Sequence, residues 1–70
     1  MTDRQMTLFN ISGLKLEIGC VQSKRAPYAR LLESGKAMNP ATIEAIVRQY
    51  DEEIDLLTKT MESLKRQVAN

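Results

Sequence analysis

The stretch from residue 39 to residue 68 reads NPATIEAIVRQYDEEIDLLTKTMESLKRQV, and it decides the fold. Its apolar residues recur at alternating steps of four and three, a seven-residue repeat that is typical of a helix packing against another helix. A β-strand does not fit this spacing, because its side chains alternate with a period of two. The stretch therefore predicts one long amphipathic helix over 40–68. The eight residues of the repeat are Ile43, Val47, Tyr50, Ile54, Leu57, Met61, Leu64 and Val68.

The residues before this repeat are typical of a helix start. Asn39 suits the N-cap, because its side chain can accept a hydrogen bond from a free backbone N–H of the first turn. Pro40 suits the first helical position, where a missing N–H costs nothing. We also expect Met38 to pack against Ile43 as a hydrophobic staple.

The first half of the chain has a similar repeat, which predicts a first helix over about 12–34. Ser12 is the expected N-cap, Gly35 the expected left-handed stop, and Pro27 the expected site of a kink. Residues 1–10 are then expected to form a flexible tail. The apolar repeat itself, interrupted by one charged residue, consists of Ile11, Leu14, Ile18, Val21, Arg25, Tyr28 and Leu32.

A β-hairpin is the alternative for the N-terminal region. Leu14, Leu16, Ile18 and Cys20 alternate as the residues of a strand do, and Ser12-Gly13 is a suitable turn. The glycines at 13 and 19 also lower helix propensity by about 1 kcal/mol each. On this interpretation, an N-terminal β-hairpin or ribbon precedes a shorter helix over about 26–34 and then the long helix.

The sequence as a whole predicts an all-α fold: one small domain over 1–70 that is a two-helix antiparallel hairpin with its turn at 35–39. A chain of 70 residues buries only about 60% of its unfolded surface, so small domains often need a further stabilising element. One cysteine and no histidine exclude an intrachain disulfide and a typical zinc site. We therefore expect two hairpins to dimerise through their heptad seams as a four-helix bundle or coiled coil.

Composition bears weakly on location and chemistry. The formal net charge is +1, which is not typical of a nucleic-acid-binding or membrane-surface protein. A free thiol at Cys20 and the lack of an apolar leader predict a cytoplasmic protein. Because no histidine is available for acid–base work near neutral pH, we expect no enzyme activity. We also expect no cofactor, metal or small-molecule substrate, and no membrane contact.

Several residues outside the apolar repeat of 43–68 are candidate contacts. Lys24, Arg25, Arg30 and Lys36 could form a basic contact surface. Arg25 lies at an apolar position, so it either extends to solvent or pairs with an acidic residue across the bundle. Tyr28 is a candidate interface anchor. Cys20 adjoins the apolar repeat and is expected to be a small buried side chain.

We predict a small protein-binding adaptor, co-chaperone or regulatory inhibitor that acts through the apolar repeat of 43–68, on a second copy and on another protein. The alternative is a dimeric DNA-binding regulator. Gly35-Lys36-Ala37-Met38-Asn39 followed by residues 43–47 resembles the turn and second helix of Arc-type ribbon-helix-helix repressors, and the turn also resembles that of helix-turn-helix repressors. The former resemblance implies a DNA-reading strand, for which residues 14–18 are the candidate. We assign the chain to no family.

Overall fold

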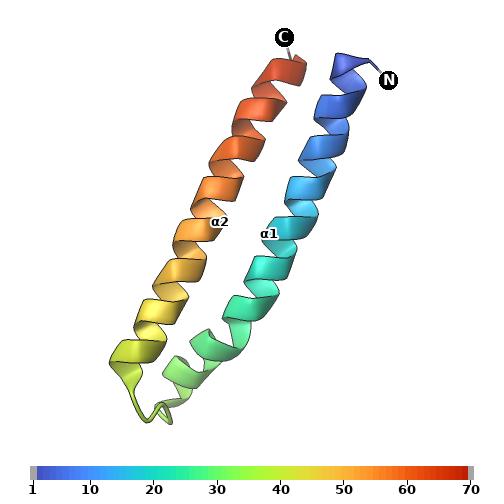
Figure 1. Cartoon of the computed structure of the whole chain (residues 1–70). Coiled ribbons are helices and arrows are strands. Elements are labelled where there is room, and N and C mark those ends of the chain that lie inside the picture. Colours follow the sequence, from blue (N-terminus) through green and yellow to red (C-terminus); the bar gives the residue numbers. More distant parts are fainter. Residues whose placement is uncertain (1, 70) are drawn as a thin grey trace.

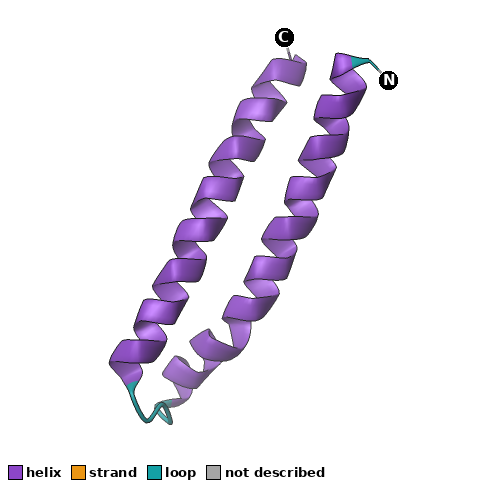
Figure 2. Ribbon diagram, viewed as in Figure 1, coloured by secondary structure: helices purple, strands orange, loops and turns teal. Residues whose placement is uncertain are grey.

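The computed structural model describes residues 2–69, and over this range the chain is all-α. Helix α1 spans Asp3–Ser34 and helix α2 spans Pro40–Ala69. They run antiparallel, with both ends of the chain at one pole of the molecule and the connecting turn at the other (Figure 1). The resulting rod measures 51 × 15 × 13 Å. The prediction of an all-α hairpin is confirmed, whereas the alternative β-hairpin is wrong, since residues 2–69 contain no strand (Figure 2).

Helix α1 begins nine residues earlier than the sequence analysis predicted. Thr2 is the N-cap, and it forms a reciprocal capping box with Gln5: the Gln5 N–H donates to Thr2 Oγ1 at 3.2 Å, and the Thr2 N–H donates to Gln5 Oε1 at 2.9 Å. This box satisfies two backbone donors at the helix start. The expected tail over 1–10 is therefore helical from Asp3 onward, and Met1 lies outside the described residues. Ser12 lies inside the helix and is not its cap.

Pro27 lies inside α1 without ending it. A proline lacks the N–H that would donate to the carbonyl four residues earlier, so it weakens and bends a helix locally. The ribbon changes direction in the green part of α1, around residues 24–30 (Figure 1). The helix stops at Gly35, whose φ of 70° is left-handed and whose N–H donates to the Leu32 carbonyl at 3.2 Å. Glycine adopts this conformation without the steric cost that a Cβ brings.

Helix α2 begins with the predicted cap but without the predicted staple. Asn39 Oδ1 accepts a hydrogen bond from the Thr42 N–H at 3.3 Å, and Pro40 is the first helical residue. Met38, in contrast, is fully exposed and cannot pack against Ile43. Residues 36 and 37 are irregular and residues 38 and 39 form a bend, so Met38 lies in the turn before the helix starts.

The two helices share a very small core. Among residues 2–69, the buried side chains are Ile11, at 7% exposure, and Val21, at 4%; both belong to α1. Two helices alone cannot enclose an apolar interior, since each side chain between them remains open to solvent on at least one side. The hairpin therefore has little hydrophobic stabilisation of its own for its size.

Candidate functional site

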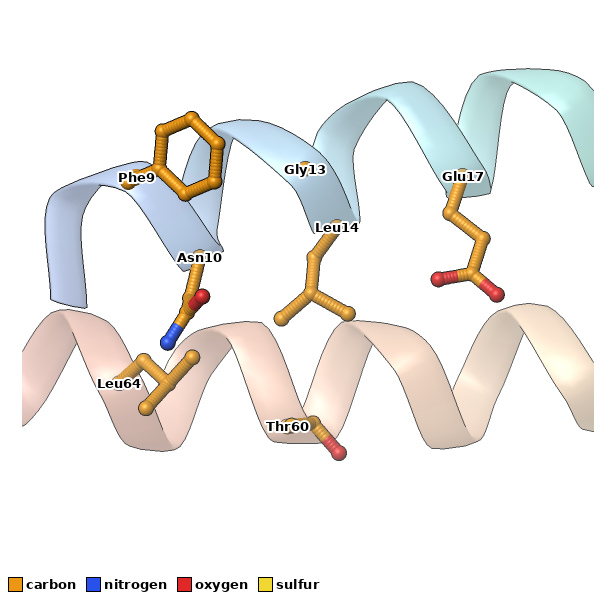
Figure 3. Close-up of a pocket in the computed structure, with 7 residues that line it drawn as sticks. All are labelled: Phe9, Asn10, Gly13, Leu14, Glu17, Thr60 and Leu64. Carbon is orange, nitrogen blue, oxygen red and sulfur yellow. The ribbon is translucent and has the colours of Figure 1, made fainter. Parts of the chain in front are cut away.

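The apolar repeat of 43–68, which we call the α2 seam, faces into the hairpin, where every one of its eight residues is partly buried. These are the residues that we predicted as a partner or dimer interface. Because α1 is the neighbouring element of α2 in this structure, the contact that half-buries them is the contact with α1. The close-up in Figure 3 shows Leu14 of α1 and Leu64 of α2 directed into this contact. A role of the seam toward another chain stays a prediction.

Two specific contacts fix how the helices align near the turn. The rings of Tyr28 and Tyr50 lie 6.1 Å apart between centroids and tilt by 33°, a geometry within the favourable range for aromatic pairs. Beside them, Arg25 Nε donates to Asp51 Oδ1 at 2.6 Å. Of the two alternatives for Arg25, the structure shows the ion pair across the helices, within one chain. Tyr28 therefore contacts its own chain.

The most exposed apolar residues of α1 lie on the face opposite α2. Phe9 is 70% exposed, Leu16 73% and Met6 53%. They recur at steps of three and seven along a helix, which places them on one face. Figure 3 shows the Phe9 ring on the side of α1 that points away from α2.

This apolar face continues as a line of uncharged residues at steps of three and four along most of α1, which we call the outer strip. Cys20 belongs to it and is exposed, so the expectation that it is buried is wrong; it faces away from α2 rather than toward it. All seven members of the strip are exposed. They are Met6, Phe9, Gly13, Leu16, Cys20, Ser23 and Pro27.

The outer strip was not predicted, because only the more regular apolar face of each helix was considered. The signal was present in the same spacing that identified the inner repeat: a second run of steps 3, 4, 3, 4, 3 and 4 with no charged residue in it. Its small members, such as Gly13 and Ser23, concealed it. The two glycines were interpreted as weakening the helix, although one of them lies on this face.

A shallow open groove of about 440 Å³ adjoins the N-terminal half of the outer strip. Phe9 and Gly13 form its outer edge, and Leu14 and Leu64 form its floor (Figure 3). The polar groups around it are an amide, a hydroxyl and one carboxylate, from Asn10, Thr60 and Glu17. The groove extends the apolar surface of the strip toward α2.

The predicted basic surface does not form a single patch. Lys24 and Arg30 are separated by six residues on α1, so their side chains point about 120° apart. Arg25 is engaged by Asp51 at 2.6 Å, and Lys36 lies in the turn after the helix. The structure therefore does not bring these four residues together.

Within residues 2–69 there is no group of three or more His, Cys, Asp or Glu side chains that could hold a metal ion. Neither α1 nor α2 combines the length and apolar character that a helix needs to span a bilayer. Comparisons with protein-family models, with curated proteins and with solved structures each found no match to this chain.

Proposed function

We propose that this chain is a non-enzymatic protein-binding module whose working surface is the outer strip of α1. The observation that carries the proposal is the exposure of Phe9 and Leu16, at 70% and 73%, on a helix face without charge. Isolated exposed apolar side chains are ordinary, but several large ones on one helix face of a small protein, here Met6, Phe9 and Leu16, are typical of an interaction surface.

A helical polypeptide is the partner class that this surface suits. A strip with steps of three and four matches the spacing of side chains on an approaching helix, which inserts its own residues between those of the strip. Phe9 and Leu16 would supply most of the affinity, since large side chains that lose most of their solvent exposure dominate binding energy. This proposal moves the predicted binding surface from the α2 seam to α1.

The chemistry around the adjacent groove supports a binding role over catalysis. Its polar lining groups come from Asn10, Thr60 and Glu17, and the chain contains no histidine. A single carboxylate without a second acid, base or nucleophile beside it is a poor arrangement for acid–base chemistry. The DNA-binding alternative has less support, because its four basic residues are dispersed and one of them is paired with Asp51.

A photo-crosslinking experiment tests the proposal. A photoreactive amino acid is placed at position 16, on the outer strip, or at position 56, on the outward face of α2, in the full chain expressed in cells. Both positions hold exposed leucines, at 73% and 66%, so they form a matched pair. We expect crosslinked protein adducts from position 16 and few from position 56. Equal yields at both positions, or no adduct from position 16, would contradict the proposal.

A further inference from the structure

The outer strip has an uneven distribution of large and small side chains. Met6 and Phe9 at its start are large, Gly13 is minimal and Leu16 is large again, whereas Cys20 and Ser23 are small, and Pro27 is the last member. A helix facing this surface fits best where its own large residues meet the small ones. The first half of the strip is rich in large residues and the second half is rich in small ones. Two copies of the strip that run in opposite directions therefore place large residues opposite small ones.

We propose that the outer strip binds the same strip of a second copy of this chain, with the two α1 helices antiparallel. This inference rests on the proposed function and names its partner. In an antiparallel coiled coil, core position a of each heptad lies opposite core position d of the other helix. One register then places Met6 opposite Ser23, Phe9 opposite Cys20 and Gly13 opposite Leu16, the numbers of each pair adding to 29.

In this register every layer joins one large and one small side chain. The twofold axis repeats each of the three pairings, so six layers cover residues 6–23 over about 26 Å of helix. A parallel arrangement would instead place Phe9 on Phe9 and Gly13 on Gly13, which leaves crowded layers next to empty ones. Crowded layers hold the helices apart, and empty layers leave cavities, so both lower the stability of the parallel pair.

The charged residues beside the strip favour the same register. One flank of the strip is formed by Asp3, Asn10, Glu17 and Lys24. With the helices in the register above, Asp3 of one copy lies beside Lys24 of the other, and Glu17 lies beside Asn10. Within the described residues, neither Asp3 nor Lys24 takes part in an ion pair of its own chain. The other flank carries only Gln5, Ser12, Gly19 and Ala26, which bear no charge.

The neighbouring antiparallel registers are worse in both respects. A shift of one heptad in one direction places Glu17 beside Glu17 and Gly13 against Ser23, so like charges meet and a small layer stays empty. A shift in the other direction places Met6 against Leu16 and Asp3 beside Glu17. Like charges facing each other destabilise a helix pair and thereby specify the register. Shape and charge therefore select the same pairing independently.

Sedimentation of the purified full chain is the first arm of the test. We expect a monomer–dimer equilibrium between about 1 µM and about 1 mM, because a short helix pair buries less area than a standard protein interface. Leu16→Lys should remove the dimer. Leu56→Lys, the matched change on α2, should leave it intact. A wild-type chain that is monomeric over the whole range, or equal loss in both variants, overturns the inference.

Disulfide trapping tests the orientation. In the proposed dimer the two Cys20 residues are offset by 11 positions, about 16 Å along the helix, which is too far for a disulfide. The wild-type chain should therefore resist oxidation to a covalent dimer, whereas Phe9→Cys should form one readily through Cys20 of the other copy. Combining Phe9→Cys with Cys20→Ser should abolish that product, since the two position-9 thiols would lie equally far apart. Rapid crosslinking of the wild type, or of this double variant, overturns the antiparallel pairing.

Charge reversal tests the register. Lys24→Asp should weaken the dimer about tenfold by placing two acidic residues together at each end. Adding Asp3→Lys should restore the affinity. Among residues 2–69, the structure shows no ion pair of either residue within its own chain, so this rescue would come from the contact between the two copies. Failure of this rescue overturns the register. If the chain proves monomeric while position 16 still crosslinks to a different protein in cells, the second-copy inference fails and the protein-binding role stands.

Discussion

Helices α1 and α2 have nearly equal lengths, 32 and 30 residues, but they place their apolar side chains differently. Helix α2 directs its apolar repeat toward α1, and on its outward face Leu56 is an isolated exposed leucine, at 66% exposure. Helix α1 is apolar on two opposite faces, one against α2 and one against solvent. The hairpin contact thus accounts for the apolar pattern of α2 but for only half of that of α1.

Backbone-disturbing residues follow the same division. Helix α1 contains Gly13, Gly19 and Pro27 in its interior, whereas α2 has one such residue, Pro40, at its first position. A Cβ built at Gly13 or Gly19 meets no atom of the chain within 4 Å, so the hairpin itself does not require glycine at either position. The comparison shows that the interior of α2 lacks glycine and proline, while α1 retains residues that lower its helix propensity and that its contact with α2 does not require.

The largest effect should come from placing a charge in the inner face of α1. Val21→Asp puts a carboxylate at a site with 4% exposure, where an unpaired charge costs several kcal/mol. A domain of this size has about 3–5 kcal/mol of net stability, so most of the helical signal in far-ultraviolet circular dichroism should disappear at 25 °C. The matched control is Leu16→Asp on the outer strip, which should keep its helical signal. Native-like melting of Val21→Asp would show that the inner face is not the stabilising one.

Truncating a side chain should have a smaller effect, and that effect should depend on whether the side chain is buried between the helices. Ile11→Ala should lower the free energy of unfolding by about 2–3 kcal/mol, because Ile11 is buried and its removal leaves a cavity. Leu56→Ala should change it by less than about 0.5 kcal/mol, since Leu56 is exposed on α2. Urea titrations at one protein concentration measure both values. Similar losses in the two variants would contradict the division between a packed and an unpacked apolar face.

Exchanging glycine and alanine between the helices should have opposite signs. Gly19→Ala in α1 should raise the free energy of unfolding by about 0.5–1 kcal/mol, because alanine loses less backbone entropy and no atom obstructs its Cβ. Ala45→Gly, on the exposed face of α2, should lower it by a similar amount. Thermal unfolding at micromolar concentration measures both. A destabilising Gly19→Ala change would indicate a hairpin contact at that glycine.

The smallest effect should come from the ion pair between the helices. Asp51→Asn removes the partner of Arg25, but their side chains are 53% and 36% exposed, so the loss should stay below about 1 kcal/mol and shrink further in high salt. Glu52→Gln is the control, an acidic neighbour for which the structure shows no ion pair. Equal losses for the two variants would mean that the pair adds nothing specific to the hairpin.

The sequence alone predicted α2 closely, because an uninterrupted repeat and the Asn39-Pro40 start agree with each other. The start of α1 was missed for the opposite reason: Ser12-Gly13 offers a local turn signal, and a helix that passes through it must tolerate the entropy of Gly13. The capping box of Thr2 and Gln5 was the competing signal, and the structure shows that it determines where α1 begins. Continuous contact with α2 offsets the cost of both interior glycines.

The candidate site was predicted less well than the fold. A repeat reveals that a helix face is apolar, but it does not reveal which surface covers that face. The hairpin half-buries the α2 seam against α1, and a role of the seam toward another chain stays a prediction. The outer strip can be located only when it is known which face of α1 packs against α2. The contact between Tyr28 and Tyr50 identifies that face, and it is visible only in the folded hairpin.

Because a single turn connects the two helices, the entropic cost of each contact between them depends on its distance from that turn. Pairs near the turn join residues separated by a short stretch of chain, whereas pairs at the opposite pole close a loop of about 60 residues at a greater entropic cost. Amide hydrogens should therefore exchange with solvent most slowly around Tyr28 and Tyr50 and progressively faster toward both ends of the chain. A partner bound along the first half of the outer strip would stabilise the end of the hairpin where the two helices separate most often. It would therefore lengthen the time for which α1 and α2 stay packed together.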